Sequence, residues 1–248
     1  MKHSISPKTL ARALLPNPIY ARLAAALKQL YVLRVLARDY GQYDSMKLNM
    51  SVGKNRQPIP WYTYPATEFL NCLEFGAMSV FEYGSGNSSR WWLERCSRLV
   101  AVESDKAWFE LVRTSVTSPR FQCIFADEAD YAGTIRTFQT SFDVIVVDGV
   151  KRADCALAAI QHVQRYGGKL LILDNSDWYP SLVPHIRDTL GWVQVDFHGF
   201  GPISRFTSTT SMFVNPQHSA SLYGAKNLAS VARMPVVAND DLRLDPHP

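Results

Sequence analysis

Short apolar runs alternate with helical stretches along the chain from Trp61 onward. This alternation is typical of a parallel sheet whose strands are joined by helical crossovers. The last two apolar runs, 191–197 and 208–214, are separated only by a loop, so we expect these strands to pair antiparallel. The pattern predicts further strands at 79–83, 99–102, 121–125, 143–147 and 169–173, and helices at 90–96, 106–116, 153–165 and 180–190. We therefore expect an α/β fold with a mainly parallel seven-stranded sheet and an antiparallel terminal strand.

The N-terminal quarter follows a different pattern. Residues 8–15 and 19–38 are rich in Ala, Leu, Arg and Lys and predict two helices, which Pro16 and Pro18 separate. Residues 41–60 are polar and rich in turn-forming residues, which indicates a linker or a mobile flap. We accordingly divide the chain into a helical N-terminal extension with its linker, a main domain, and a tail with at most one short helix: 1–60, 61–216 and 217–248.

Charge is distributed unevenly along the chain. Residues 1–60 hold 10 Lys and Arg against 2 Asp and Glu, whereas the remainder holds 16 against 20. The net charge of +4 is too small to indicate nucleic acid, and we expect no nucleic-acid partner. For the basic N-terminal helices we favour a solvated charged face, and peripheral contact with anionic lipid or a phosphorylated carrier is the alternative.

Composition and cysteine spacing narrow the class of protein. Apolar residues make up 47% and aromatic residues 12% of the chain, which is enough for a sizeable core. The four cysteines form no Cys-x-x-Cys pair, so we expect neither a zinc finger nor a disulfide scaffold, and we expect a cytoplasmic location. Every apolar stretch is shorter than the ~18–20 residues that a membrane span requires, so no transmembrane segment is predicted. The pattern does not indicate an oligomeric state.

A glycine-rich loop follows the first strand of the main domain, where residues 82–89 read Glu-Tyr-Gly-Ser-Gly-Asn-Ser-Ser. Ligands of open α/β sheets bind at the carboxyl ends of the strands, and glycines let the backbone approach them closely. We expect Ser88 or Ser89 to cap the next helix, whose N–H groups would then face the ligand. Ser89 replaces the third glycine of the dinucleotide fingerprint, which favours a single nucleoside. A tight turn without a ligand is the alternative.

Acidic residues follow the next two strands. Glu103 comes about 20 residues after the glycine loop, where an acid can accept hydrogen bonds from both hydroxyls of a ribose, and Ser104 is adjacent to it. Asp127 follows the third strand and could accept from the exocyclic amine of an adenine. A helix N-cap is an almost equally favoured role for Asp127.

The order and spacing of these motifs resemble those of the class I S-adenosylmethionine-dependent methyltransferases, which have a Rossmann-like, seven-stranded fold. Glu82-Tyr-Gly-Ser-Gly is similar to their first motif, Glu103 to their ribose-binding acid and Asp127 to their adenine-contacting acid. Asp148 resembles the residue that ends their fourth strand. The resemblance covers roughly residues 60–215. It implies S-adenosylmethionine as the cofactor, held by Glu82, Gly84, Ser85, Gly86, Ser88, Glu103, Ser104, Asp127 and Asp148.

The resemblance also bears on the acceptor. It is to the methyltransferases of small molecules and glycans rather than to the nucleic-acid enzymes, because the chain lacks an Asn/Asp-Pro-Pro-Tyr/Phe motif. We therefore expect a hydroxyl acceptor on a small molecule or glycan, with Asp148 as the catalytic residue. The aromatic segments 61–65, 178–179 and 197–202 are expected near the mouth of the site, where they could stack on an acceptor, or else in ordinary core packing.

A metal site is a further expectation. Asp148 ends the fourth strand and Asp174-Asn175 ends the fifth, which resembles the divalent-metal triad of the catechol-type O-methyltransferases. Carboxylate and amide oxygens suit Mg²⁺, which would orient an acceptor hydroxyl and lower its pKa. The alternative is that Asp148 contacts only the cofactor amine, while Asp174 and Asn175 begin a turn.

Two other functions stay open. A nucleotide-dependent oxidoreductase would use the same glycine loop, although the missing third glycine argues against it. A non-catalytic Rossmann-like subunit would keep the fold and hold a partner through the basic N-terminal helices.

Overall fold

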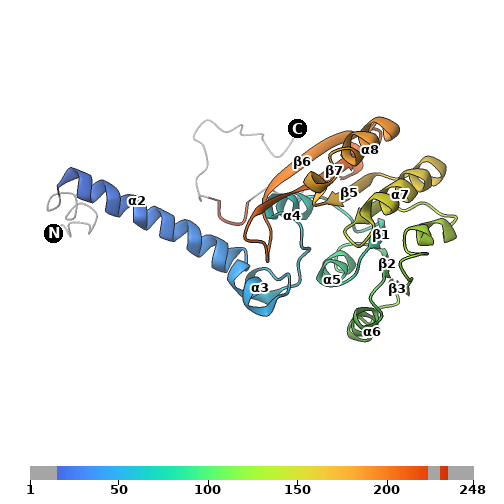
Figure 1. Cartoon of the computed structure of the whole chain (residues 1–248), viewed down its shortest axis with the longest axis horizontal. Helices are drawn as coiled ribbons and strands as arrows, with labels where there is room; N and C mark the ends of the chain where they lie inside the picture. Colours follow the sequence, from blue (N-terminus) through green and yellow to red (C-terminus); the bar gives the residue numbers. More distant parts are fainter. Residues whose placement is uncertain (1–15, 223–229, 234–248) are drawn as a thin grey trace, which may run out of the picture.

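The computed structural model describes residues 16–222 and 230–233, and it contains a seven-stranded sheet with helices on both faces (Figure 1). The strands are β1 (Ser79–Tyr83), β2 (Arg98–Glu103), β3 (Phe121–Phe125), β4 (Val144–Val147), β5 (Leu170–Asp174), β6 (Val193–Phe200) and β7 (Thr207–Val214). The helices are α2 (Asn17–Arg34), α3 (Gln42–Leu48), α4 (Tyr64–Asn71), α5 (Asn87–Leu93), α6 (Lys106–Ser115), α7 (Arg152–Tyr166), α8 (Leu182–Leu190) and α9 (Ser219–Leu222). Short 3-10 turns lie at Lys54–Arg56, Ala132–Thr137 and Ser176–Trp178.

The strand order in the sheet is β3-β2-β1-β4-β5-β7-β6. The first five strands pair parallel, whereas β7 runs antiparallel to both of its neighbours, β5 and β6. These pairings confirm the expected α/β fold, and they place the last strand of the chain inside the sheet rather than at its edge. The direction in which strands are added reverses between β1 and β4, and such a reversal is where open α/β sheets bind ligands.

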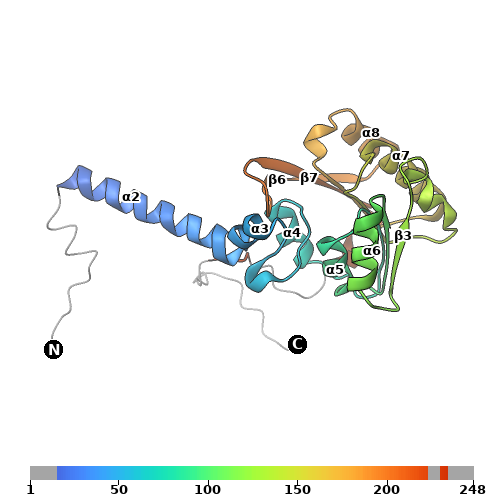
Figure 2. The ribbon, with the colours of Figure 1, turned by 60° about the horizontal axis from the view of Figure 1, so that its bottom comes forward.

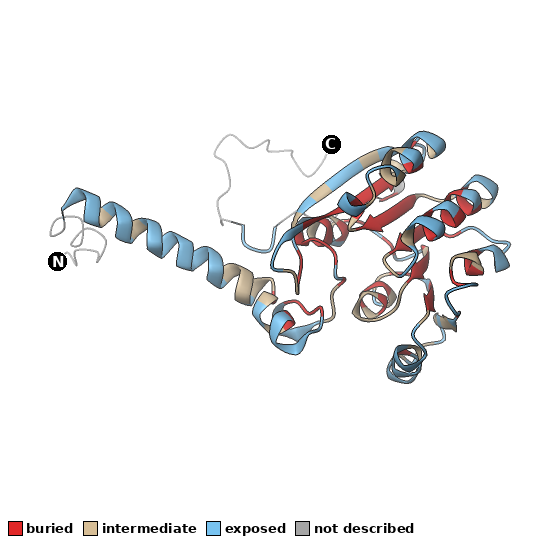
Figure 3. Ribbon diagram, in the orientation of Figure 1, coloured by how far each residue is buried: buried red, intermediate tan, exposed pale blue. Residues whose placement is uncertain are grey.

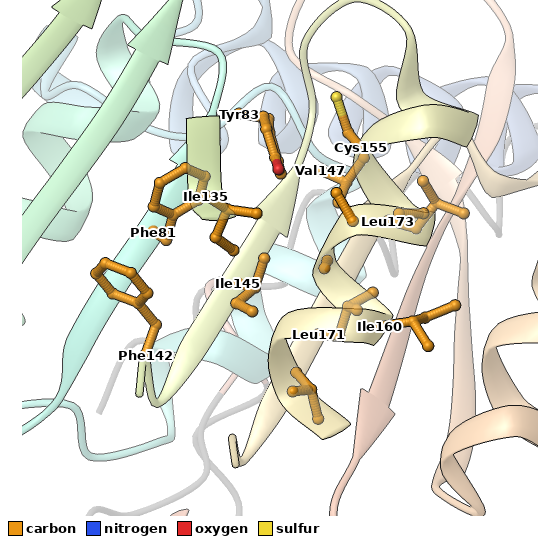
Figure 4. Packing of buried hydrophobic residues seen from close by; sticks show 14 of the residues in the cluster. Phe81, Tyr83, Ile135, Phe142, Ile145, Val147, Cys155, Ile160, Leu171 and Leu173 are labelled. Carbon is orange, nitrogen blue, oxygen red and sulfur yellow. The ribbon is translucent and has the colours of Figure 1, made fainter. Parts of the chain in front are cut away.

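Both faces of the sheet are covered. β1, β2, β4 and β5 are mostly apolar, and all their residues except the first of β1 and the first of β2 are buried. Successive side chains of a strand point to opposite faces. Phe81, Ile145 and Leu171 pack on one face with side chains of α7, α8 and the 132–137 turn (Figure 4). Val80 and Val146 pack on the other face with α4 and α5. The sheet is therefore the shared wall of two apolar cores, and the outer helix surfaces are exposed (Figure 3).

In the described part of the N-terminal extension, α2 is a long helix that projects from the sheet domain (Figures 1 and 2). α2 begins directly after Pro16, and Pro18 lies in its first turn, where a helix tolerates proline. A π-helical turn, Val35–Asp39, continues it. This agrees with the predicted helix at 19–38. The other predicted helix, 8–15, lies outside the described residues.

Residues 41–60, expected to be a linker or flap, contain α3 and a closely packed loop. Gly41 has a φ of +74°, and a Cβ there would lie 2.4 Å from the backbone of Gly53. The hydroxyl of Ser45 donates to the carbonyl of Val52, and both residues are buried. The segment is therefore part of the packed structure. Its polar composition did not predict this packing.

Two helices differ from the sequence expectation. α4 was not predicted, because its eight residues lie between aromatic and polar positions without a clear period. α5 begins at Asn87 and ends at Leu93, three residues earlier at each end than the predicted helix at 90–96. The tail contributes the short helix α9, and the rest of it lies largely outside the described residues.

Candidate active site

A pocket of about 580 Å³ lies at the carboxyl ends of β1, β2, β4 and β5. It brings together all predicted site residues except Asp127: Glu82, Gly84, Ser85, Gly86, Ser88, Glu103, Ser104, Asp148, Asp174 and Asn175. Its remaining lining residues are Asn49, Met50, Ser51, Trp61, Asn87, Trp108, Tyr131, Gly149, Val150, Arg152, Trp178, Ile203, Ser204 and Phe206.

The glycine loop starts where β1 ends. Gly84 has a φ of +104°, which side chains with a Cβ rarely adopt. A Cβ at Gly84 would lie 3.1 Å from the carbonyl oxygen of Asp148. The close approach that requires glycine here is between the ends of β1 and β4. The sequence predicts that glycine lets the backbone approach a ligand closely. In the structure, glycine also lets the backbone of Gly84 lie close to the backbone of Asp148.

The start of α5 places two serines in its first turn. Gly86 occupies the N-cap position, so the expectation that Ser88 or Ser89 caps this helix is wrong. Ser89 is fully buried, accepts a hydrogen bond from the N–H of Gly86 at 3.1 Å, and donates to Glu82 Oε2 at 2.5 Å. Ser89 thus joins the glycine loop to the acid of β1, while Ser88 lines the pocket.

Glu82 is a buried acid that is only partly satisfied. Its Oε2 accepts from Ser89, whereas its Oε1 has no hydrogen-bond partner among the described residues. Burial raises the pKa of the Glu82 carboxyl to about 7, and the neighbouring hydroxyls of Ser88 and Ser89 oppose that rise. A buried acceptor without a donor costs free energy. A ligand that brings an N–H donor or a positive charge into the pocket would remove this cost.

Glu103 is held at the end of β2 by three donors. Its Oε1 accepts from the backbone N–H groups of Ser104, at 2.8 Å, and Asp105, at 2.9 Å. Its Oε2 accepts from the hydroxyl of Ser85 at 2.8 Å. Since a carboxylate offers about four lone-pair sites, one remains for a ligand hydroxyl. The geometry therefore leaves room for one ribose hydroxyl, where the spacing predicts that Glu103 accepts from both.

Trp108 is a pocket residue that sequence reasoning missed. Its indole Nε1 donates to the carbonyl of Ser85 at 2.8 Å, and a Cβ at Gly86 would lie 3.5 Å from its ring. Asp105 fixes the backbone by accepting from the N–H of Trp108 at 2.8 Å. Trp108 thus clamps the glycine loop from the first turn of α6. The sequence carries no signal for this, because an indole at the start of a helix is ordinarily a packing residue.

Asp127 lies outside the pocket and is exposed. Its Oδ1 accepts from the backbone N–H groups of Ala129, at 3.0 Å, and Asp130, at 3.2 Å. These bonds favour the capping role that the sequence left open, here in a turn rather than at the start of an α-helix.

The carboxyl ends of β4 and β5 meet around the guanidinium of Arg152, the first residue of α7. Its Nη2 lies 2.9 Å from Asp148 Oδ1, and its Nη1 lies 3.6 Å from Asp174 Oδ2. Nη1 also donates to Asn175 Oδ1 at 2.9 Å, and Nε donates to the carbonyl of Gly149 at 3.1 Å. A planar fork of five N–H donors suits this arrangement of acceptors.

This arrangement does not fit the predicted Mg²⁺ site. The structure does bring Asp148, Asp174 and Asn175 together, but the guanidinium of Arg152 takes up an oxygen of each. Among the residues that the structure describes, no group of three or more His, Cys, Asp or Glu is placed to hold a metal ion. The guanidinium already occupies the space that a cation would take between these carboxylates, so the residues present do not fit a metal ion.

Both carboxylates beside Arg152 are perturbed. Loss of contact with water, followed by the charge of Asp174, raises the pKa of Asp148 well above its usual range, and Arg152 opposes that rise. Burial raises the pKa of Asp174 to about 6, although Arg152 and a 2.6 Å hydrogen bond from the hydroxyl of Thr210 oppose it. A single guanidinium thus compensates the charge of two acids only in part, and this favours the protonated form of one of them.

The described lining of the pocket is acidic. It contains four carboxylates, those of Glu82, Glu103, Asp148 and Asp174, against the single guanidinium of Arg152. A concave surface with one sign of charge concentrates ligands of the opposite sign. The pocket therefore suits a ligand that carries positive charge and disfavours a diphosphate.

Aromatic side chains surround the mouth of the pocket. Trp61 is 50%, Trp178 60% and Phe206 60% exposed, and all three line it. This confirms the expected position of Trp61 and Trp178. Phe197, expected in the same set, instead packs against Phe69 with ring centroids 5.0 Å apart.

The N-terminal region supplies one wall of the pocket. Asn49, Met50 and Ser51, which follow α3, all line it. The side-chain amide of Asn87 donates to the carbonyl of Ser51 at 2.8 Å, so the first residue of α5 is bonded directly to this wall. The segment that the sequence indicated as a linker thus contributes to the site.

Comparisons with known proteins add similarities of fold. No protein-family model matches the sequence, and no curated protein matches it. Among solved structures, the N-methyltransferase NodS from Bradyrhizobium japonicum WM9 is 18% identical with a TM-score of 0.40, over 57% of this chain and 88% of that chain. A putative methyltransferase from Pseudomonas syringae is 16% identical with a TM-score of 0.40, over 59% and 93%. The C-terminal domain of precorrin-6Y C5,15-methyltransferase from Rhodobacter capsulatus is 12% identical with a TM-score of 0.43, over 59% and 85%.

Proposed function

We propose that this chain is an S-adenosylmethionine-dependent methyltransferase that methylates a hydroxyl group of a small molecule or glycan. The acidic lining around the glycine loop supports this most strongly. S-adenosylmethionine carries an ammonium and a sulfonium group, which suit four carboxylates and one guanidinium. The diphosphate of a dinucleotide would meet the same carboxylates unfavourably, which argues against the oxidoreductase alternative.

Three residues would hold the cofactor. Glu103, already fixed by two backbone N–H groups, would accept from a ribose hydroxyl. The unpartnered Oε1 of Glu82 would accept from the ammonium group. Trp108 would keep the glycine loop in place through its bond to Ser85. The cofactor supplies a methyl group on a sulfonium, which leaves as a neutral thioether.

Asp148 would accept the proton of the acceptor hydroxyl. Burial and the charge of Asp174 raise the pKa of this carboxyl, and a carboxylate with a raised pKa is a stronger proton acceptor. Arg152 would orient it by holding Oδ1. The exposed rings of Trp61 and Trp178 would present flat apolar faces to the acceptor.

Calorimetry with S-adenosylhomocysteine and with NAD tests the proposal on the whole chain. We expect S-adenosylhomocysteine to bind and NAD not to bind. Binding of NAD alone would favour the oxidoreductase. Binding of neither compound would favour a non-catalytic subunit that retains the fold.

The role of Asp148 is tested with the acceptor in hand. A screen of hydroxylated metabolites and glycans by mass spectrometry would reveal products that are one methyl group heavier. Asp148→Asn should then lower turnover by about 10²–10⁴-fold, as expected for loss of a general base, and leave the affinity for S-adenosylhomocysteine nearly unchanged. A loss of that affinity instead would assign Asp148 to the cofactor amine.

We propose the cytoplasm as the site of this activity. The four cysteines, Cys72, Cys96, Cys123 and Cys155, are all free thiols, which suits a reducing compartment.

A further inference from the structure

α2 presents an apolar face that nothing in the described structure covers. Ile19, Leu23, Leu27 and Leu30 follow one another at spacings of four, four and three residues, which places them along one side of the helix. Their side chains are 52%, 46%, 58% and 60% exposed. None of the residues of α2 is buried, and the helix stands away from the sheet domain (Figure 3). Burial of this face against a partner would be favourable.

The charges on α2 are all positive. Arg22, Lys28 and Arg34 are its only charged residues, and the sequence has no Asp or Glu before Asp39. Arg22 lies beside the apolar face, whereas Lys28 lies on the opposite side of the helix. Arg34 follows Leu30 by one turn, and its long side chain can carry its charge to the edge of an apolar layer.

Charge decides between the candidate partners. A second copy of α2 would bring three more positive charges and no acid to pair with them, so two such helices would repel each other along their flanks. A membrane rich in anionic lipid supplies both an apolar layer for the leucines and negative charge for the flanks. None of the described helices is long and apolar enough to cross a membrane.

We propose that α2 lies in the plane of an anionic membrane surface, with Ile19, Leu23, Leu27 and Leu30 inserted among the lipids. At 1.5 Å per residue the helix is about 27 Å long, which gives it several turns of contact. Tyr31, 63% exposed, is amphipathic and suits the boundary between headgroups and acyl chains. α3 and the pocket wall at 49–51 follow α2 in the chain, so attachment would hold the pocket close to the surface.

Flotation of the full chain with lipid vesicles tests the proposal. We expect binding to vesicles that contain phosphatidylglycerol and little binding to pure phosphatidylcholine. The triple variant Leu23→Gln, Leu27→Gln, Leu30→Gln should lose binding. The triple variant Arg22→Gln, Lys28→Gln, Arg34→Gln should bind about 100-fold more weakly, because each charge near an anionic surface contributes about fivefold.

A matched control lies on the opposite side of the same helix. Ala21→Gln, Ala25→Gln and Val32→Gln introduce the same side chain three times without touching the leucine face, and this variant should bind like the wild type. All variants should keep the wild-type affinity for S-adenosylhomocysteine, because α2 contributes no residue to the pocket.

Three results would overturn the proposal. The first is a full chain that stays in solution with phosphatidylglycerol vesicles. The second is equal loss of binding in the leucine variant and its opposite-face control. The third is a dimer, seen by sedimentation equilibrium, that only the leucine variant dissociates, since a second copy would then cover the face.

Discussion

The buried carboxyl of Glu82 lowers the stability of the protein, and the same carboxyl is expected to bind the ligand. Its pKa in the folded protein, about 7, is higher than the ordinary value of 4.5, so the folded state holds the proton more tightly. Stability therefore falls as the pH rises from 4.5 towards 7 and stays reduced above that. We predict that Glu82→Gln is more stable than the wild type above pH 7, by up to about 3 kcal/mol, and binds S-adenosylhomocysteine more weakly.

Denaturant unfolding across pH 4–8 and calorimetry at each pH provide the measurement. Glu94→Gln is the control, because Glu94 follows α5 and its side chain is 67% exposed. This variant should change neither the stability nor the affinity for S-adenosylhomocysteine appreciably. A Glu82→Gln protein that is destabilised at pH 8 would contradict the assignment of a buried, unpaired charge.

Glu103 should matter for affinity more than for folding. In Glu103→Gln the side-chain oxygen can still accept from the N–H groups of Ser104 and Asp105. The charge and one acceptor oxygen are lost, which should lower the affinity for S-adenosylhomocysteine roughly ten- to hundredfold. Titration calorimetry measures this, with the exposed Glu110→Gln as control. Equal affinities of Glu103→Gln and wild type would remove Glu103 from the site.

The guanidinium of Arg152 contacts the three side chains that were predicted to bind a metal ion. Two expectations follow from this. Activity should persist in EDTA, because the carboxylates are already paired. Arg152→Met should lower the free energy of unfolding by about 3–5 kcal/mol, since it leaves the buried Asp174 and the partly buried Asp148 without their partner. Arg113→Met, which breaks an exposed pair with Glu110, should cost less than about 1 kcal/mol. Loss of activity in EDTA that returns with added Mg²⁺ would restore the metal hypothesis.

At the residue scale, positions at strand ends were predictable and their partners were not. Glu82, Glu103, Asp148 and Asp174 follow from the rule that sites lie at the carboxyl ends of strands. Arg152 was missed because it enters the site from the next helix, as a side chain whose direction no sequence pattern specifies. The metal hypothesis therefore took no account of this guanidinium.

At the element scale, the junction between β1 and α5 is a packing constraint as well as a ligand loop. Gly84→Ala should lower the free energy of unfolding by about 1–3 kcal/mol, because it forces a Cβ into a φ of +104° and to 3.1 Å from Asp148. Gly133→Ala is the matched control, since a Cβ there meets nothing within 4 Å. Thermal unfolding measures both, and equal midpoints of Gly84→Ala and Gly133→Ala would show that the β1–β4 contact does not require glycine.

The strands were more predictable than the short helices. Runs such as Val144–Val147 are wholly apolar and bounded by polar residues, so their type and position follow from composition. α3 and α4 have seven and eight residues, too few to show a helical period. α5 starts earlier than expected because Gly86, and not a serine, occupies its N-cap position.

At the scale of the whole molecule, the pocket depends on the N-terminal region. A chain that begins at residue 39 would lose α2 but keep Tyr40, whose hydroxyl donates to Glu68 at 2.7 Å, and the wall at 49–51. We predict that it binds S-adenosylhomocysteine like the full chain. A chain that begins at residue 61 lacks the wall and should bind at least about tenfold more weakly, since a loss of about 1.4 kcal/mol corresponds to that factor.

Calorimetry on both shortened chains tests this, with circular dichroism to show that each retains its secondary structure. Wild-type affinity in the folded chain that begins at residue 61 would mean that the wall at 49–51 does not contact the ligand.

The overall fold was predictable because the order of strands and helices determines the sheet. The contribution of 41–60 was not, because it depends on contacts such as Asn87 with Ser51, far apart in the chain.

The bond between Asn87 and Ser51 has a thermodynamic consequence. It connects the glycine loop to the segment that continues, through α3, into α2. If occupancy of the pocket changes the placement of residues 49–51, then lipid attachment at α2 and occupancy are linked equilibria. Reciprocity then requires that each event alter the equilibrium constant of the other by the same factor. Vesicles would tighten or loosen nucleoside binding as much as the nucleoside alters partitioning onto vesicles.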